Sequence, residues 1–182
     1  MSHSGDDALA RAQEAAQRFV SGEAGFAQVT TLDRRGYPVT RTMTAFLGAD
    51  WSVSLVQRRA HARLAQWARD PRTLVAWVGT PAPGATNERP HVFDIGQLPP
   101  RVVAVRGDAE LQPDEWTVRV YREHLDAQRA RGFTRAPVRT DDEAARDLAG
   151  VVVRPVRVRL EGFGEGAQSF TFDPTKPEGT QQ

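Results

Sequence analysis

Three arginines, Arg58, Arg59 and Arg63, follow a short apolar segment at residues 53–56 and stand where a helix is predicted to begin. Guanidinium groups bind phosphate through paired N–H donors, and the first turn of a helix adds unpaired backbone N–H groups. The spacing therefore predicts an anion site, and phosphate is the ligand that suits it best. A solvent-exposed helix face would carry the same arginines, so this pattern alone leaves both interpretations open.

The arginines are positioned by two predicted strands and the helix between them. Residues 53–56 alternate apolar residues with serine, which favours a strand with one buried face. Residues 73–78 are rich in β-branched and aromatic residues and predict a second strand. The apolar spacing between the two predicts a short amphipathic helix over residues 58–69. This helix ends before Pro71, because proline disfavours the helical conformation in the residue that precedes it.

Val56-Gln57 at the end of the first strand is followed by Arg63, which stands eight positions before Pro71. This pattern resembles the pyridoxamine 5'-phosphate oxidase family of split-barrel flavoproteins. In that family a strand ends beside the flavin ring, and a basic residue at this spacing holds the flavin phosphate. The resemblance implies cofactor contacts at Val56, Gln57, Arg58, Arg59 and Arg63.

The preceding stretch, LDRRGYPVTRTMTAF at residues 32–46, resembles the strand, glycine turn and polar strand that come before the phosphate site in this family. Arg41, the first basic residue of this polar strand, stands fifteen positions before Val56. In the oxidase, the basic residue that opens the flavin-binding strand has the same spacing. The resemblance therefore implies flavin contacts at Arg41, Thr42, Met43 and Thr44. Hydroxyl groups and a guanidinium fork can hold phosphate and ribityl oxygens. A threonine-rich strand with one solvated face needs no ligand, so that alternative stays open.

The remaining apolar pattern predicts a mixture of helices and strands. Helices are expected over about residues 6–21, 113–132 and 141–148, and strands over 26–32, 37–47, 102–111 and 150–163. The first three strands are predicted to form a meander, and Gly107 and Pro155 indicate a bulge or a sheet edge. This order predicts an α+β protein built on a mostly antiparallel β-barrel with flanking helices. The resemblance specifies an FMN-binding split barrel. We expect one domain over residues 1–172 and a flexible tail over residues 173–182.

Two parts of the sequence differ from the oxidase pattern. Position 102 holds valine where the oxidase has a flavin-contacting glutamine, and residues 161–166 replace the arginine- and histidine-bearing segment that binds substrate phosphate. The sequence therefore argues against vitamin B6 metabolism.

A long, proline-rich connection at residues 81–101 is predicted to fold over the cofactor as a lid. His91 within it could act as an acid or base, but surface histidine is the simpler interpretation.

The composition excludes several other classes of protein. The formal net charge is +1, which lacks the basic excess of a duplex-binding protein, so we expect no nucleic-acid partner. The chain has no cysteine, which excludes thiol chemistry, and its four histidines show no metal-ligand spacing, so no metal site is expected. It has no run of eighteen apolar residues and no signal-peptide pattern. We therefore expect a cytoplasmic protein without a membrane partner.

The resemblance implies a flavin-dependent oxidoreductase that binds FMN at the interface of a homodimer. It would transfer hydride to or from a small-molecule substrate, and the protein would supply binding and orientation, with no catalytic side chain required. The four tryptophans would lie in the core or at the subunit interface. Two alternatives share the fold. One is a deazaflavin-dependent reductase, in which Arg58 and Arg59 beside Arg63 suit a longer anionic tail. The other is a non-catalytic protein that stores or senses a flavin or holds haem.

Overall fold

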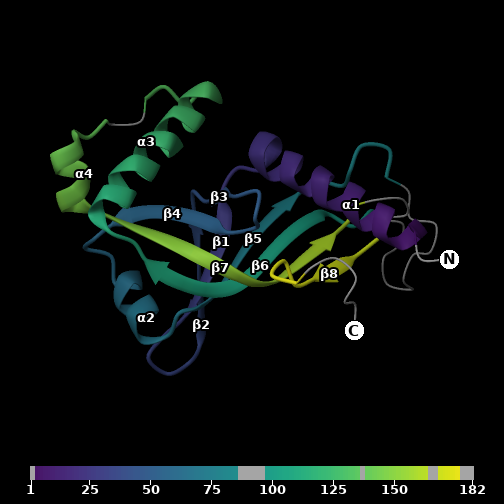
Figure 1. The fold of residues 1–182 in the computed structure, drawn as a ribbon, viewed down its shortest axis with the longest axis horizontal. Helices are drawn as coiled ribbons and strands as arrows, with labels where there is room; N and C mark the ends of the chain where they lie inside the picture. The colour runs from purple at the N-terminus through teal and green to yellow at the C-terminus, as the bar shows by residue number, and fades with distance from the viewer. Residues whose placement is uncertain (1–2, 86–96, 136–137, 164–167, 177–182) are drawn as a thin grey trace.

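One antiparallel sheet forms the body of the molecule, and helices lie around it (Figure 1). The computed structural model describes residues 3–85, 97–135, 138–163 and 168–176, with only the backbone of residues 3–6. The strands are β1 Ala27–Leu32, β2 Pro38–Met43, β3 Phe46–Leu47, β4 Val53–Arg58, β5 Arg72–Gly79, β6 Arg101–Leu111, β7 Leu148–Glu161 and β8 Phe170–Phe172. The helices are α1 His3–Arg18, which continues as a π-helical turn at Phe19–Glu23, α2 Arg63–Arg69, α3 Asp114–Ala130 and α4 Asp141–Asp147.

The sheet is curled so that its two edges come from neighbouring parts of the chain. The strand order is β2-β1-β5-β6-β7-β4-β3, with β8 paired to the far half of β7. β2 and β3 thus lie at opposite ends of the hydrogen-bonded order, although only Thr44 and Ala45 separate them in sequence. The sheet must therefore curl back on itself, as a barrel that is split between β2 and β3. This confirms the prediction of an α+β, mostly antiparallel split barrel with flanking helices.

The pairing of β6 with β7 is irregular at one position. Their register shifts between Arg106 and Gly107, so that Gly107 faces Pro155. A β-carbon at Gly107 would lie 1.9 Å from the carbonyl oxygen of Arg154, so a side chain has no room there. Proline lacks the N–H that a regular ladder would use, and an irregularity bends the strand that carries it. The predicted bulge is confirmed, whereas β7 is a central strand and not an edge.

The core fills the inside of the curled sheet with branched aliphatic side chains. The buried residues alternate along β6, as a sheet with one covered face requires. Trp51, Trp67 and Trp77 are buried, and Trp116 is half-buried. The tryptophans therefore belong mainly to the core and offer little exposed aromatic surface to a partner. The most completely buried aliphatic side chains are Val29, Val53, Leu55, Val75, Val103, Val105, Val151, Val153, Val158 and Leu160.

A buried arginine fastens the end of α1 to the sheet. Arg101 is 6% exposed and donates to both carboxylate oxygens of Glu23, at 3.1 and 2.7 Å, and to the carbonyl oxygen of Thr80 at 2.9 Å. Its guanidinium lies 4.6 Å from the ring centroid of Phe19. The pKa of Glu23 is lowered from its usual value by the hydrogen bond from Arg101. Hydrogen bonds to a carboxylate and a carbonyl oxygen, together with the aromatic ring, thus offset the cost of burying this charged side chain.

Several predicted elements differ from the observed ones. The helix expected over residues 58–69 begins only at Arg63, because β4 runs through Arg58 and residues 59–62 form the turn. The strand expected over residues 37–47 breaks at Thr44 and Ala45. The predicted meander is confirmed in part: β1 pairs with β2 and β3 pairs with β4, but the break at Thr44 and Ala45 separates these two pairs, and the other neighbour of β4 is β7. The sequence analysis also missed β8.

Two further expectations meet the limits of the described residues. Most of the predicted lid, including His91, lies outside the residues that the structure describes. Among the helices of the described ranges, none combines the length and apolar character needed to cross a lipid bilayer.

We predict that Gly107→Ala destabilises the protein by about 2 kcal/mol or more, because the added methyl group meets backbone that cannot rotate away. Gly25→Ala is the matched control, since a β-carbon there meets nothing within 4 Å. Urea denaturation of both variants measures the difference. Equal stabilities would contradict a close approach of β6 to β7 at this position.

Candidate functional site

Gln57, near the end of β4, presents a buried amide with only half of its hydrogen-bonding capacity used. Its side chain is 6% exposed, and its Oε1 accepts a hydrogen bond from Arg63 Nη1 at 2.9 Å. Its Nε2 is buried without a hydrogen-bond partner in the structure. Exchanging the two amide atoms would place an NH₂ group against a guanidinium donor, so the observed orientation is the favourable one. An unpaired buried donor is costly, and an acceptor atom on a ligand would relieve that cost.

Arg63 is the first residue of α2, and its guanidinium reaches Met43 on β2 and Gln57 on β4. Its Nη1 also donates to the Met43 sulfur. The side chain is half-buried, and burial, followed by the nearby charge of Arg41, lowers the pKa of the Arg63 guanidinium from its usual value. Arg63 has no carboxylate partner among the residues that the structure describes. A partly buried cation without a counter-ion favours the binding of an anion.

Gln57 and Arg63 line a cavity, and the break between β2 and β3 forms a polar edge of it. Thr42, Met43 and Thr44 line it, and β4 contributes Val56, Gln57 and Arg58 from the other side. These residues come together because β2 and β4 lie at or near the two edges of the sheet, and the curl of the sheet brings its edges side by side. The structure thus brings together seven of the nine predicted cofactor contacts: Thr42, Met43, Thr44, Val56, Gln57, Arg58 and Arg63.

Two predicted contacts lie apart from this group. Arg59 follows β4 and turns away from the cavity, donating to Asp114 and, at 2.9 Å, to the carbonyl oxygen of Ala145. Its charge is therefore balanced by α3 and α4. Arg41 is exposed on β2 and does not line the cavity, although it lies close enough to influence the Arg63 charge.

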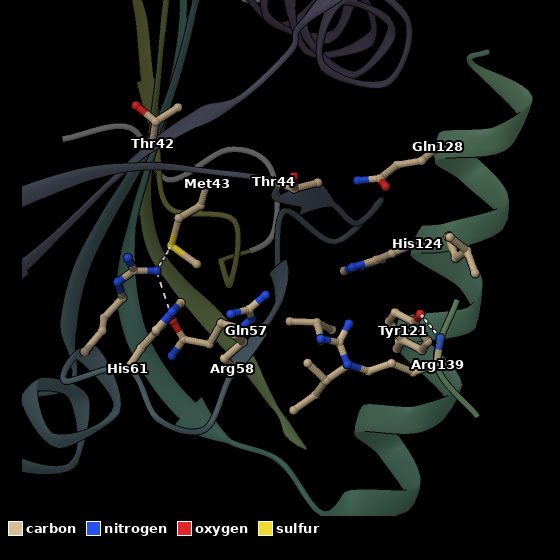
Figure 2. A pocket seen from close by; sticks show the side chains of 14 residues that line it. Thr42, Met43, Thr44, Gln57, Arg58, His61, Tyr121, His124, Gln128 and Arg139 are labelled. Carbon is tan, nitrogen blue, oxygen red and sulfur yellow. Dashed lines mark hydrogen bonds between the residues drawn. The ribbon is translucent and has the colours of Figure 1, made fainter. Parts of the chain in front are cut away.

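Helix α3 forms the opposite wall, and sequence analysis did not identify it as part of a site. Tyr121, His124, Leu125 and Gln128 line the cavity from this helix (Figure 2). Their spacing of three and four residues places them on one helical face, which is the signal that could have found them. Additional cavity residues that were not predicted are His61, Arg139 and Leu148.

The close seating of α3 on β7 depends on Gly150. A β-carbon there would lie 2.6 Å from the ring of Trp116 and 2.7 Å from the hydroxyl of Thr117. The Gly150 N–H donates to Thr117 Oγ1 at 2.9 Å, and that hydroxyl donates to the carbonyl oxygen of Pro113 at 2.9 Å. Glycine thus lets the helix approach the strand closely enough to wall the cavity.

His124 is a neutral polar group in this wall. Its Nε2 shares a hydrogen bond of 2.8 Å with Ser54 Oγ, and its ring stacks on Phe46 with centroids 3.7 Å apart and planes 17° apart. Burial lowers the pKa of His124 to about 4, so the imidazole is uncharged at neutral pH. It can therefore donate or accept a hydrogen bond without adding charge to the cavity.

The charge of the cavity is one-sided. Its volume is about 350 Å³, and the residues that line it include three arginines and two histidines but no Asp or Glu from the described parts of the chain. Such a lining attracts anions and disfavours cations. A cavity of this size suits a small organic ligand. The Arg63 guanidinium and the Gln57 amide donor together fit a ligand with a phosphate and acceptor atoms.

Comparison with solved structures identifies the fold. A haem-binding protein from Mycobacterium smegmatis matches with a TM-score of 0.58 and 21% identity, over 90% of this chain and 58% of that chain. An F420 reductase matches with a TM-score of 0.52 and 16% identity, over 76% of this chain and 91% of the reductase. A Clostridium acetobutylicum protein related to general stress protein 26 of B. subtilis, of the pyridoxinephosphate oxidase family, matches with a TM-score of 0.55 and 8% identity, over 88% and 93%. This chain has the pyridoxamine phosphate oxidase-like split-barrel fold.

The similarity is one of structure more than of sequence. No protein-family model matches the chain, and no curated protein matches it either. The chain spans 58% of the length of the mycobacterial haem-binding protein. Neighbours of this split barrel thus include proteins named for a deazaflavin coenzyme, for haem and for the oxidase family, and the cofactor must be argued from the cavity.

We predict that acidification from pH 7.5 to pH 5 costs the protein about 1–2 kcal/mol through His124 alone. The folded-state pKa lies below the unfolded value, so the unfolded chain takes up the proton first. The stabilising effect is complete above about pH 6.5 and is lost as the pH falls toward 4. Urea denaturation of the parent and of His124→Gln at both pH values measures it. His61→Gln, at an exposed position, is the control, and an identical pH dependence in parent and His124→Gln would contradict the prediction.

Proposed function

We propose that this protein is a flavin-dependent oxidoreductase that binds FMN in the cavity at the split of the barrel. The observation that carries the proposal is the pair formed by Arg63 and Gln57. Within the described part of the chain, a half-buried guanidinium without a carboxylate partner lies beside a buried amide donor without an acceptor. Both deficits are relieved by one ligand that combines a phosphate with ring or hydroxyl acceptors.

The phosphate end of FMN is best accommodated by Arg63. Burial and the nearby charge of Arg41 disfavour the charged form of the Arg63 guanidinium. A charge-assisted hydrogen bond to phosphate compensates for this cost. Arg58 lines the same cavity and adds a second positive charge. The hydroxyl groups of Thr42 and Thr44 line the adjoining edge and suit ribityl oxygens.

The ring end of FMN is best accommodated between β4 and α3. Val56, Leu125 and Leu148 supply apolar surface on the two sides, and the Gln57 amide supplies a donor for a ring acceptor. Bound flavin supplies hydride-transfer chemistry, and the protein supplies binding, orientation and exclusion of water. The substrate in this proposal is a small molecule that shares the cavity, and no side chain is required as a catalytic acid or base.

Two alternatives keep the same cavity and change its occupant. A deazaflavin coenzyme is supported by the similarity to a reductase named for such a coenzyme. Because Arg59 is hydrogen-bonded to Asp114 and Ala145, Arg58 and Arg63 would bind the anionic tail of this coenzyme. Haem is supported by the similarity to a haem-binding protein and by two histidines in the lining. Of these, His124 already shares its Nε2 with Ser54, which makes it a poor iron ligand.

A second copy of the chain is part of the proposal. Large apolar side chains are exposed on the strands and turns around the sheet: Phe26 at 67%, Tyr37 at 66%, Val78 at 61% and Val156 at 56%. Covering them against a partner would remove apolar area from water. In the resembled family the cofactor lies in the groove between subunits, and we propose the same arrangement here.

We predict that Arg63→Ala weakens FMN binding by roughly ten- to a hundred-fold, because it removes a charge-assisted contact to phosphate. Arg63→Lys should recover much of the loss, since it keeps the charge. Arg69→Ala is the control on the same helix: Arg69 is exposed and donates to the carbonyl oxygen of Leu32 at 2.9 Å. Fluorescence titration with FMN measures all three. If Arg63→Ala binds FMN like the parent while Arg69→Ala does not, the phosphate position is wrong.

Absorbance spectra of the purified protein incubated separately with FMN, the deazaflavin coenzyme and haem will identify the occupant. We expect FMN to bind, to be reduced by a nicotinamide donor and to be reoxidised by a substrate. Binding of FMN without reduction by any donor would favour the storage or sensing alternative.

We predict a homodimer in dilute solution, which light scattering measures directly. A double substitution of exposed apolar residues, Val78→Ser with Val156→Ser, should shift the population toward monomer, because both side chains are more than half exposed in the single chain. A stable monomer of the parent that still binds FMN with full affinity would remove the interface from the proposal.

A further inference from the structure

The α3 wall of the cavity carries a cation that the phosphate end of FMN does not need. Arg139 precedes α4 and extends its side chain into the cavity from the side of α3 (Figure 2). Its backbone N–H donates to the Tyr121 hydroxyl at 2.9 Å, which fixes the start of the side chain. The side chain is 25% exposed. Arg139 is thus a positioned, mostly covered guanidinium that faces the ligand space.

The charge of Arg139 is only partly balanced within the protein. Its Nε lies 3.8 Å from a carboxylate oxygen of Asp147, which is beyond hydrogen-bonding distance. The same carboxylate lies 2.9 Å from Arg146 Nε, in a hydrogen-bonded pair. Two guanidinium groups therefore share one carboxylate, and one positive charge is left over. Because no acidic side chain of the described chain lines the cavity, nothing in the lining cancels that charge.

The residues of α3 that line this wall add hydrogen-bonding capacity but no further charge. Gln128 lines the same wall one helical turn beyond His124, and His124 is held neutral by its burial. A carboxylate or phosphate oxygen that met Arg139 would therefore meet no second charge from the lining residues of α3. The wall thus combines one excess cation with neutral polar neighbours, which is a suitable arrangement for a single anionic group.

We propose that Arg139 forms a second anion subsite, separate from the Arg63 phosphate site, and that this subsite binds a carboxylate of the substrate. Arg63 lies on α2 and contacts Met43 of β2, whereas Arg139 lies before α4 and contacts Tyr121 of α3, so the two cations serve different ends of the ligand space. The assignment to a substrate rests on the proposed FMN-dependent function. The anionic tail of a deazaflavin coenzyme carries the same chemistry, and the experiment separates these two sources.

The test uses benzoate and benzamide, which match in shape and differ in charge. Each is titrated into the FMN-loaded protein, and the perturbation of the flavin absorbance gives its affinity. We expect benzoate to bind about ten-fold more tightly than benzamide, as a charge-assisted pair implies. Arg139→Gln should abolish this preference while changing FMN affinity less than about two-fold, and Arg139→Lys should keep part of it. Arg129→Gln, at the end of α3 and outside the cavity lining, should leave the preference intact.

Asp147→Asn tests the charge balance with an effect of opposite sign. Removing the shared carboxylate leaves Arg139 without its competing anion, so benzoate should bind about two- to five-fold more tightly than in the parent. A merely structural role of Arg139 would not produce tighter binding. The proposal is overturned if benzamide binds the parent as tightly as benzoate, if benzoate does not bind, or if Arg139→Gln retains the preference.

Failure of the subsite and failure of the proposed function are distinguishable. If FMN does not bind the parent, the proposed function fails, and benzoate and benzamide are titrated into the flavin-free protein with NMR detection of arginine side-chain N–H signals. Loss of the preference in Arg139→Gln then still supports the subsite. Titration with the deazaflavin coenzyme identifies the source of the anion. Weaker coenzyme binding by Arg139→Gln assigns the subsite to the cofactor tail and overturns the substrate assignment, whereas unchanged coenzyme binding supports it.

Discussion

The close crossing of β6 and β7 is the constraint on which the rest of the structure depends. At Gly107 and Pro155 the two backbones approach so closely that a β-carbon has no room, and the ladder shifts by one residue. Such an irregularity bends both strands and increases the local twist. The bend lets the first half of β7 pair with β4 and the second half pair with β8, so that one long strand serves two parts of the sheet. The two edges can then meet across Thr44 and Ala45.

The cavity exists because this curled sheet does not close by hydrogen bonds at its two ends. β2 and β3 leave polar side chains at the split, and β4 lies beside them through its pairing with β3. Helix α3 covers the opening, since Gly150 allows Trp116 and Thr117 to pack directly against β7. A rigid antiparallel sheet thus supplies one wall of the cavity and a closely seated helix supplies the other, which is the kind of preorganised support that binding sites require.

The electrostatics of the cavity follow from which arginines are balanced elsewhere. Arg101 is buried among Glu23, Thr80 and Phe19, and Arg59 is engaged by Asp114 and Ala145, so neither charge is available to a ligand. Arg63 and Arg139 differ, because the first has no carboxylate among the described residues and the second shares one with Arg146. In an arginine-rich chain, the number of guanidinium groups therefore says little about function, whereas their partners decide which of them face a ligand.

The sequence by itself determined most of the strands, the β4–α2–β5 order and the segment that holds Gln57 and Arg63, because these depend on local patterning, on proline and on short spacings. It also located the irregularity at Gly107, since glycine marks close backbone approach. Only the tertiary structure decided that β4 pairs with β7, that Arg59 turns away, and that His124 and Arg139 reach the cavity. These contacts join residues far apart in the chain, and no local pattern specifies which distant partner a strand edge or a guanidinium will meet.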